Sequence, residues 1–200
     1  QRDDIAKIIE EYDRMKLRIG MTASHSALDI CDGGIEEGFP TVAYCQEGRH
    51  KTYANYFKTK RSGSGRVLRG MVDKAIVMPS FNDVMDESMQ VEMRKRNVVY
   101  IPNRSFTSYS SIEDVENKFK VPLFGSRNML RMEERPEEQD YYWILDKAGL
   151  PYPEAIENPE DIDCLVIVKL HHAQKKLERG FFTCASYHVS YTHLRAHETI

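Results

Sequence analysis

Short apolar runs alternate with helical patterns along the first half of the chain, and this alternation constrains the fold most strongly. Residues 17–21 and 41–45 are short runs typical of buried strands. The residues between them, 27–37, carry apolar side chains at helical spacing, and Gly38 follows as a helix stop. A crossover of this length joins parallel strands, because an antiparallel pair needs only a tight turn. The sequence therefore predicts a β–loop–α–β unit.

The same pattern continues along the chain. Residues 75–78 and 98–101 are predicted strands, and 83–96 between them is a predicted helix. A further amphipathic helix is predicted at residues 4–16, before the first strand. Strands and helices that alternate at this pitch indicate an α/β fold with an open parallel sheet and helices on both faces. We expect this sheet over residues 16–125, with ligands bound beyond the carboxyl ends of its strands.

Polar loops follow two of the predicted strands. The loop after the first strand contains Ser24, His25 and Ser26, and the loop after residues 98–101 contains Arg104 and Ser105. Hydroxyl groups and free backbone N–H groups at a helix start suit a phosphate, and His and Arg add positive charge. The alternative interpretation is a plain helix N-cap in one loop and a solvated arginine in the other. Two such loops at adjacent strand ends favour a binding site more than either loop alone.

A basic segment separates these two loops. Between Arg49 and Lys74 there are eight Lys or Arg residues and a single acid, Asp73. Its centre, residues 61–66, is rich in Gly and Ser, which is typical of a flexible segment. The segment is either a lid that attracts an anionic ligand or a surface excursion that faces water. We favour the surface interpretation for its tip.

The later part of the chain has a different pattern. Residues 140–148 are a predicted helix that ends at Gly149. Residues 165–169 are a strongly apolar predicted strand, and 181–185 are its predicted antiparallel partner. The apolar strand ends on Lys169, which can reach a nucleotide phosphate as a point charge. The alternative is a lysine whose aliphatic stem lies along the apolar surface at the strand end.

Charge and hydropathy exclude several classes of protein. The chain has 28 Lys and Arg against 31 Asp and Glu, a balance that argues against a nucleic-acid binder. No apolar run approaches the roughly 20 residues that cross a bilayer, and the charged N-terminus is unlike a secretory signal. The four cysteines match neither a disulfide framework nor a zinc site. We expect a cytoplasmic protein with neither nucleic acid nor a membrane as partner, while self-association into a homo-oligomer stays open.

The last residues, 189–200, match nothing before them. They resemble translated adapter sequence at the end of a truncated reading frame, so we predict a non-native tail and exclude it from the fold. His193 and His197 have the i, i+4 spacing of metal ligands, but we expect no metal site there.

Seven motifs occur in a fixed order along the chain: TASHSALDI (22–30), EGFPT (37–41), Gly48-Arg49 with Tyr53, IPNRSF (101–106), VENKFKVPLFG (115–125), RMEER (131–135) and NPEDIDCLVIVK (158–169). In this order they resemble FAICAR synthetase, the ATP- and formate-dependent AICAR ligase of archaeal purine biosynthesis. The resemblance covers residues 5–187. No single motif is diagnostic, whereas seven in register are quite specific.

The resemblance implies an ATP-grasp architecture. Residues 1–125 are then an N-terminal substrate-binding α/β domain of the pre-ATP-grasp, Rossmann-like type, and 126–188 are the start of an incomplete ATP-grasp domain. The implied reaction forms formyl phosphate from formate and ATP, and the amine of AICAR attacks it to give FAICAR, ADP and phosphate. ATP and Mg²⁺ are the implied cofactors, and the metal ligands are expected in a C-terminal part outside this chain. We therefore expect the parent protein to be a ligase and this truncated chain to be inactive.

The resemblance also assigns binding residues. The substrate-binding His and Ser of the family fall on His25 and Ser105, and its ATP-grasp lysine falls on Lys169. Further substrate-binding positions are expected at their neighbours: Ser24, Ser26 and Arg104. The implied small-molecule partners are AICAR, formate and ATP, and the catalytic residues are not identified.

The sequence departs from the family at several points. Ala23 stands where the family commonly has Gly, and Asn103 stands where it often has His; we expect both changes to retune phosphate contacts. Residues 61–70 resemble an insertion. Two alternatives stay open: another ATP-grasp ligase with a different phosphorylated substrate, and a non-catalytic module that binds a nucleotide phosphate.

Overall fold

The computed structural model describes residues 2–133, 139–169 and 181–188. The chain divides into two compact units, Gln1–Ile144 and Leu145–Ile200. The predicted tail, 189–200, lies outside the described residues. Within the described part of the chain, no helix combines the length and apolar character that a membrane span requires.

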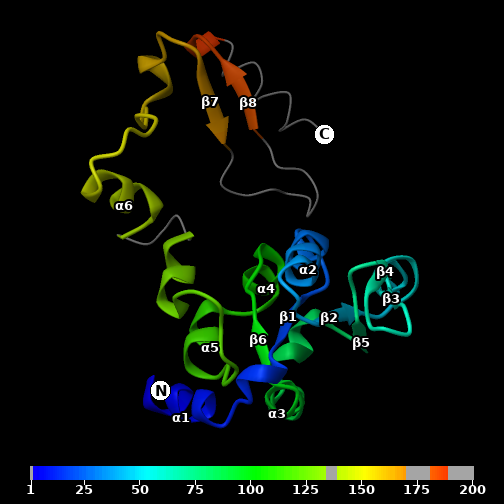
Figure 1. Cartoon of the computed structure of the whole chain (residues 1–200). Helices are drawn as coiled ribbons and strands as arrows, with labels where there is room; N and C mark the ends of the chain where they lie inside the picture. The colour runs from blue at the N-terminus through cyan, green and yellow to red at the C-terminus, as the bar shows by residue number, and fades with distance from the viewer. Residues whose placement is uncertain (1, 134–138, 170–180, 189–200) are drawn as a thin grey trace. The chain divides into compact units, whose positions relative to one another are not determined.

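The first unit is built on a parallel sheet of four strands (Figure 1). The strands are β1 (Arg18–Thr22), β2 (Thr41–Gln46), β5 (Lys74–Met78) and β6 (Val98–Tyr100), and their order is β5-β2-β1-β6. Every neighbouring pair is parallel, and Gly20 of β1 lies opposite both Val42 and Tyr100. The predicted α/β fold with an open parallel sheet is therefore confirmed.

Helical segments connect and flank these strands: α1 (Arg2–Glu10), η1 (Arg14–Lys16), α2 (Ala27–Glu36), the π-helix η2 (Thr52–Tyr56), η3 (Phe81–Met85), α3 (Glu87–Lys95), α4 (Arg104–Tyr109), α5 (Ile112–Asn117) and η4 (Arg127–Glu133). Two predicted helices are interrupted. The helix predicted at 4–16 ends at Glu10, because Asp13 starts a separate turn by accepting a hydrogen bond from Met15 N. The helix predicted at 83–96 is divided at Asp86, whose extended backbone separates η3 from α3.

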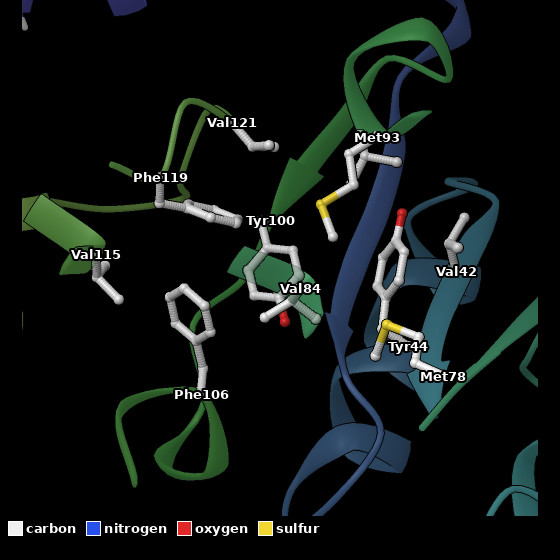
Figure 2. Close-up of a cluster of buried hydrophobic side chains, with 11 residues drawn as sticks. Val42, Tyr44, Met78, Val84, Met93, Tyr100, Phe106, Val115, Phe119 and Val121 are labelled. Carbon is white, nitrogen blue, oxygen red and sulfur yellow. The ribbon is translucent and has the colours of Figure 1, made fainter. Parts of the chain in front are cut away.

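Both faces of the sheet are covered, as predicted. Val42 and Tyr44 of β2 pack into one apolar cluster, to which Phe119 also belongs (Figure 2). The alternate residues of the same strand, Ala43 and Cys45, pack into a second cluster together with buried residues of α2. Because successive side chains of a strand point to opposite faces, an unbroken buried run such as β2 requires apolar cover on both sides.

The first unit continues beyond residue 125, the expected domain boundary. Arg127 donates to the carbonyl oxygens of Val115, Phe119 and Val121, at 2.6, 2.8 and 2.9 Å. These three bonds hold the start of η4 against the end of the sheet domain, so packing does not stop at residue 125. The functional boundary there remains a prediction.

The second unit contains an antiparallel hairpin of β7 (Val166–Lys169) and β8 (Phe181–Cys184). Val166 lies opposite Cys184, which confirms the predicted antiparallel pairing. Helix α6 (Tyr141–Lys147) spans the boundary between the two units, and the short turn η5 (Pro159–Asp161) precedes the hairpin.

Candidate functional site

Both predicted polar loops leave the sheet at the same edge. β1 and β6 are neighbours and run parallel, so the loops after Thr22 and after Tyr100 begin side by side at the carboxyl edge. The backbone N–H of Ile101 donates to Gly20 O at 2.8 Å and extends this pairing past the end of β6. The predicted adjacency of the two loops is therefore confirmed.

Asn103 joins these two loops directly. Its side-chain Nδ2 donates to O of Thr22, the last residue of β1, at 2.8 Å and to Ser24 O in the following loop at 3.1 Å. Its Oδ1 accepts a hydrogen bond from Phe106 N at 3.1 Å and so caps α4. The side chain is buried, and its donors and acceptor are all used. One residue thus fixes the start of α4 and the backbone around Ser24.

A second buried contact ties the same strand ends together. Thr22 Oγ1 and the Tyr100 hydroxyl lie 2.6 Å apart, and both residues are fully buried. Burial raises the pKa of Tyr100 well above its ordinary value, so the phenol stays neutral and able to share its proton with Thr22. The Tyr100 ring also contacts Phe106 and Phe119, with centroids 4.9 and 5.3 Å away (Figure 2). Buried contacts between side chains therefore fix the ends of β1 and β6 below the two loops.

His25 lies in a constrained turn just after β1. Its φ of 46° is in the left-handed region, which is uncommon for a residue with a side chain. Ala27 N donates to His25 O at 2.8 Å and to Ser24 O at 3.1 Å, and these bonds close the turn. The turn leaves His25 exposed at the edge of the sheet. Backbone strain of this kind at an exposed histidine is a feature of functional loops.

A pocket of about 350 Å³ opens beside His25. Its lining consists of Ala23–His25 after β1, together with Gly48, Arg49 and Lys51–Tyr53 after β2. The lining therefore includes one histidine and two permanent cations, and it includes no carboxylate. A pocket with this set of groups attracts an anion.

The predicted site residues are placed differently with respect to this pocket. Ser24 and His25 line it, whereas Ser26, Arg104 and Ser105 do not. Ser26 occupies the N-cap position of α2, but its hydroxyl makes no capping hydrogen bond. Arg104 is exposed and Ser105 is buried in the first turn of α4. A shared cleft for His25 and Ser105 remains a prediction.

The basic segment divides into two parts with different surroundings. Its start, Arg49 and Lys51–Tyr53, lines the pocket together with Gly48, and none of these residues was among the predicted site residues. The sequence did contain a signal for their role in binding, because these residues directly follow a strand, as the two polar loops do. Recognising it required the knowledge that β2 lies next to β1 in the sheet.

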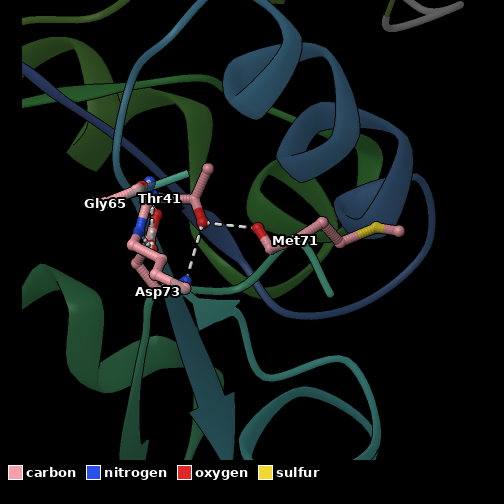
Figure 3. Close-up of polar contacts among 5 residues, drawn as sticks. Thr41, Gly65, Met71 and Asp73 are labelled. Carbon is pink, nitrogen blue, oxygen red and sulfur yellow. Dashed lines mark hydrogen bonds and ion pairs between the residues drawn. The ribbon is translucent and has the colours of Figure 1, made fainter. Parts of the chain in front are cut away.

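The later part of the basic segment is anchored at the opposite edge of the sheet. It forms a hairpin of β3 (Lys60–Arg61) and β4 (Val67–Arg69). Arg61 contacts Asp73 at 2.7 Å, and Asp73 in turn accepts a hydrogen bond from the backbone N–H of Thr41 at 3.0 Å (Figure 3). Thr41 is the first residue of β2, so this network lies at the amino edge. The geometry favours a surface excursion over a lid on the pocket.

The cysteines near the sheet are structural. Cys31 and Cys45 are fully buried in the second apolar cluster, and burial raises the pKa of each thiol to about 12. A neutral buried thiol is a poor nucleophile. This agrees with the interpretation of these residues as small apolar groups.

Two further expectations, a phosphate-binding role of Lys169 and a bound metal ion, concern residues outside the pocket. Lys169 ends β7, as predicted, and its backbone pairs with Phe181. Among the described residues, no three His, Cys, Asp or Glu side chains gather closely enough to hold a metal ion. We therefore assign no step to a metal ion in the described part of the chain.

Known proteins resemble this chain in sequence and in fold. The chain is 38% identical over 185 residues to the 5-formaminoimidazole-4-carboxamide-1-(beta)-D-ribofuranosyl 5′-monophosphate synthetase of Methanopyrus kandleri, and this match covers 92% of the chain and 46% of the relative. The protein of the same name from Methanocaldococcus jannaschii is 36% identical, with the same coverage of both chains. The chain thus spans about half the length of the curated relatives it matches.

A solved structure, that of an IMP biosynthesis protein PurP from Thermococcus kodakaraensis, shares the fold. Its TM-score is 0.53 at 24% sequence identity, over 82% of this chain and 48% of that one. The model of a family described as a protein of unknown function, DUF1246, matches residues 19–156. That match covers more than half of the chain, which therefore belongs to the DUF1246 family.

Proposed function

We propose that this chain is the substrate-binding N-terminal part of an ATP- and formate-dependent ligase that converts AICAR to FAICAR in purine biosynthesis. The observation that carries the proposal is the name of relatives 38% and 36% identical, which specifies synthesis of the formylated 5′-monophosphate. The pocket supports it, because its position at the carboxyl edge and its cations suit a phosphorylated substrate. Such a ligase acts on AICAR, formate and ATP in the cytoplasm, away from nucleic acid and membranes.

The proposed reaction has two steps. A formate oxygen takes the γ-phosphoryl group of ATP, which gives formyl phosphate and ADP. The amine of AICAR then attacks the formyl carbon, the C–O bond to phosphate breaks, and the amine loses a proton as FAICAR forms. Mg²⁺, when bound, neutralises charge on the nucleotide phosphates.

The residues of this chain bind and orient the substrates in this proposal. His25 holds AICAR at the pocket, Ser24 contributes a hydroxyl group, and Ser105 with Arg104 acts from the first turn of α4. The loop between the strand and α2 also includes Ser26, which we assign to the same substrate. Lys169 would bind an ATP phosphate in the ATP-grasp part. Phosphoryl transfer depends on positioning and metal-assisted charge stabilisation, so we expect the chain alone to bind AICAR weakly without turnover.

Isothermal titration of the chain with AICAR, beside a coupled assay for ADP in the presence of formate and Mg²⁺, tests this proposal. We expect measurable binding, no ADP formation, and at least a several-fold weaker affinity for His25→Ala. The matched control is His188→Ala, which lies in the second unit. Absence of binding in a folded sample would contradict the proposed substrate. Tighter binding of a different phosphorylated compound would indicate another ligase, and robust ADP formation would contradict the expected inactivity.

A further inference from the structure

Two cations, Arg49 and Lys51, line the pocket. Several basic side chains of this unit pair with acids, as Arg61 does with Asp73 at 2.7 Å and Arg94 does with Glu87 at 2.8 Å. Within the described residues, neither Arg49 nor Lys51 forms an ion pair. Both line the pocket, which has no carboxylate of its own. Their positive charge is therefore available to a ligand.

A tight turn after β2 and a contact with an aromatic ring fix the position of Arg49. Gly48 has a φ of 81°, and Arg49 N donates to Gln46 O at 3.1 Å, so a tight turn directly follows β2. The guanidinium carbon of Arg49 lies 5.6 Å from the centre of the Phe81 ring, and Phe81 is buried. A cation placed over an aromatic face is restrained there. The N–H groups at the edge of the guanidinium remain able to bind two oxygens of one anion.

Lys51 complements Arg49 from the next turn. It is exposed and directly precedes η2, whose residue Tyr53 packs into the apolar cluster under α2. This packing fixes the backbone that bears the lysine, while the side chain itself supplies a compact charge with three donors. Together with His25, the pocket offers three groups with which to surround one compact anion.

We propose that Arg49 and Lys51 form the subsite for a phosphate monoester, with Arg49 binding two phosphate oxygens and Lys51 balancing the second negative charge. This assignment rests on the proposed function, in which the ligand is the 5′-phosphate of AICAR. It gives the start of the basic segment a role in substrate selection, separate from the hairpin at residues 60–69. It also distinguishes the nucleotide from its nucleoside, which lacks the phosphate.

The test compares AICAR with its dephosphorylated nucleoside in isothermal titrations of the full 200-residue chain. The variants are Arg49→Gln and Lys51→Gln, and their matched controls are Arg69→Gln and Lys60→Gln in the exposed hairpin. We expect each pocket variant to lose about tenfold in affinity for AICAR, as is usual for a charge-assisted hydrogen bond. Affinity for the nucleoside should not change, and the hairpin controls should bind AICAR as the unsubstituted chain does.

Two results would overturn the subsite. One is an equal loss of affinity for nucleotide and nucleoside in the pocket variants. The other is an equal loss in pocket variants and hairpin controls, which would indicate only a general effect of net charge. Titration with ribose 5-phosphate separates this proposal from the function: binding that depends on Arg49 without binding of AICAR would support the subsite and contradict the function. A folded chain that binds none of the three compounds would contradict both.

Discussion

At the amino edge of the parallel sheet, Asp73 pairs with Arg61 and accepts a hydrogen bond from the backbone of β2, whereas at the carboxyl edge Arg49 and Lys51 line a pocket without a carboxylate. The same basic segment supplies the cations at both edges. Satisfied polar groups contribute to stability, and unpaired cations at a strand end are available for binding. Changes at the two edges should therefore separate loss of stability from loss of affinity.

Asp73→Ala should have the largest effect on stability. The substitution removes the partner of Arg61 and leaves the backbone N–H of Thr41 without its acceptor at 3.0 Å. A lost hydrogen bond to a charged group destabilises by about 1.5–3 kcal/mol. Urea denaturation should show this loss, while titration should show unchanged affinity for AICAR.

A matched control for Asp73→Ala is Glu92→Ala. Glu92 also pairs with basic residues, Lys95 and Arg96, but on the exposed surface of α3. Exposed pairs contribute about 0–1 kcal/mol, so this variant should be nearly as stable as the unsubstituted chain. Equal destabilisation by the two substitutions would argue against a special role of the amino-edge network.

Asn103→Ala should lower both the stability of the chain and its affinity for AICAR. It removes one bond to the end of β1, one to the loop after it, and the cap of α4, so we expect a loss of about 1–2 kcal/mol in unfolding free energy. Release of the backbone at Ser24 should also lower affinity for AICAR several-fold, because the His25 turn is then less well fixed. Ser111→Ala is the control, since Ser111 caps α5 away from the pocket. We expect Ser111→Ala to lose a similar amount of stability while its affinity for AICAR stays unchanged.

The sequence predicted the sheet well because each strand carries its own local signal. The run Thr41–Cys45 contains no charged residue and is buried throughout, as suits a strand covered on both faces, and the structure gives β2 over Thr41–Gln46. The division of the helix predicted at 83–96 was missed. There, a capping box of Ser80 and Asp83 starts η3 at Phe81, and the extended backbone of Asp86 ends η3 before α3 begins at Glu87.

The candidate site was only partly predictable, because it depends on which strands are neighbours. His25 was found from its position after a strand, and it lines the pocket. Arg49 was noted only as part of a motif and Lys51 only as part of the basic segment, and neither was predicted as a site residue before β2 was placed beside β1. Asn103 likewise has no local sign of its two bonds to Thr22 O and Ser24 O, which join residues far apart in the sequence.

Tyr100→Phe tests the buried contact between β1 and β6 at the carboxyl edge. It removes the hydroxyl that lies 2.6 Å from Thr22 Oγ1 and leaves that buried oxygen without this partner. We expect a loss of about 1 kcal/mol in denaturation experiments. The double variant Thr22→Val with Tyr100→Phe removes both polar groups, so a double-mutant cycle should show that their effects are not additive. Additive losses would mean that the two hydroxyls do not interact.

Leu68→Ser should have the smallest effect on stability. It tests whether the hairpin of β3 and β4 contacts a ligand bound at the carboxyl edge. Leu68 is 64% exposed in β4, so its removal deletes few buried contacts. Substitutions at such positions change stability by less than about 0.5 kcal/mol. If the hairpin were a lid, an exposed apolar residue on it would contact the bound ligand or the pocket rim, and affinity for AICAR would fall on substitution. We expect no change in affinity, because the hairpin is tied through Arg61 to Asp73 at the amino edge. A several-fold loss of affinity in a variant of unchanged stability would show that the hairpin closes over the ligand.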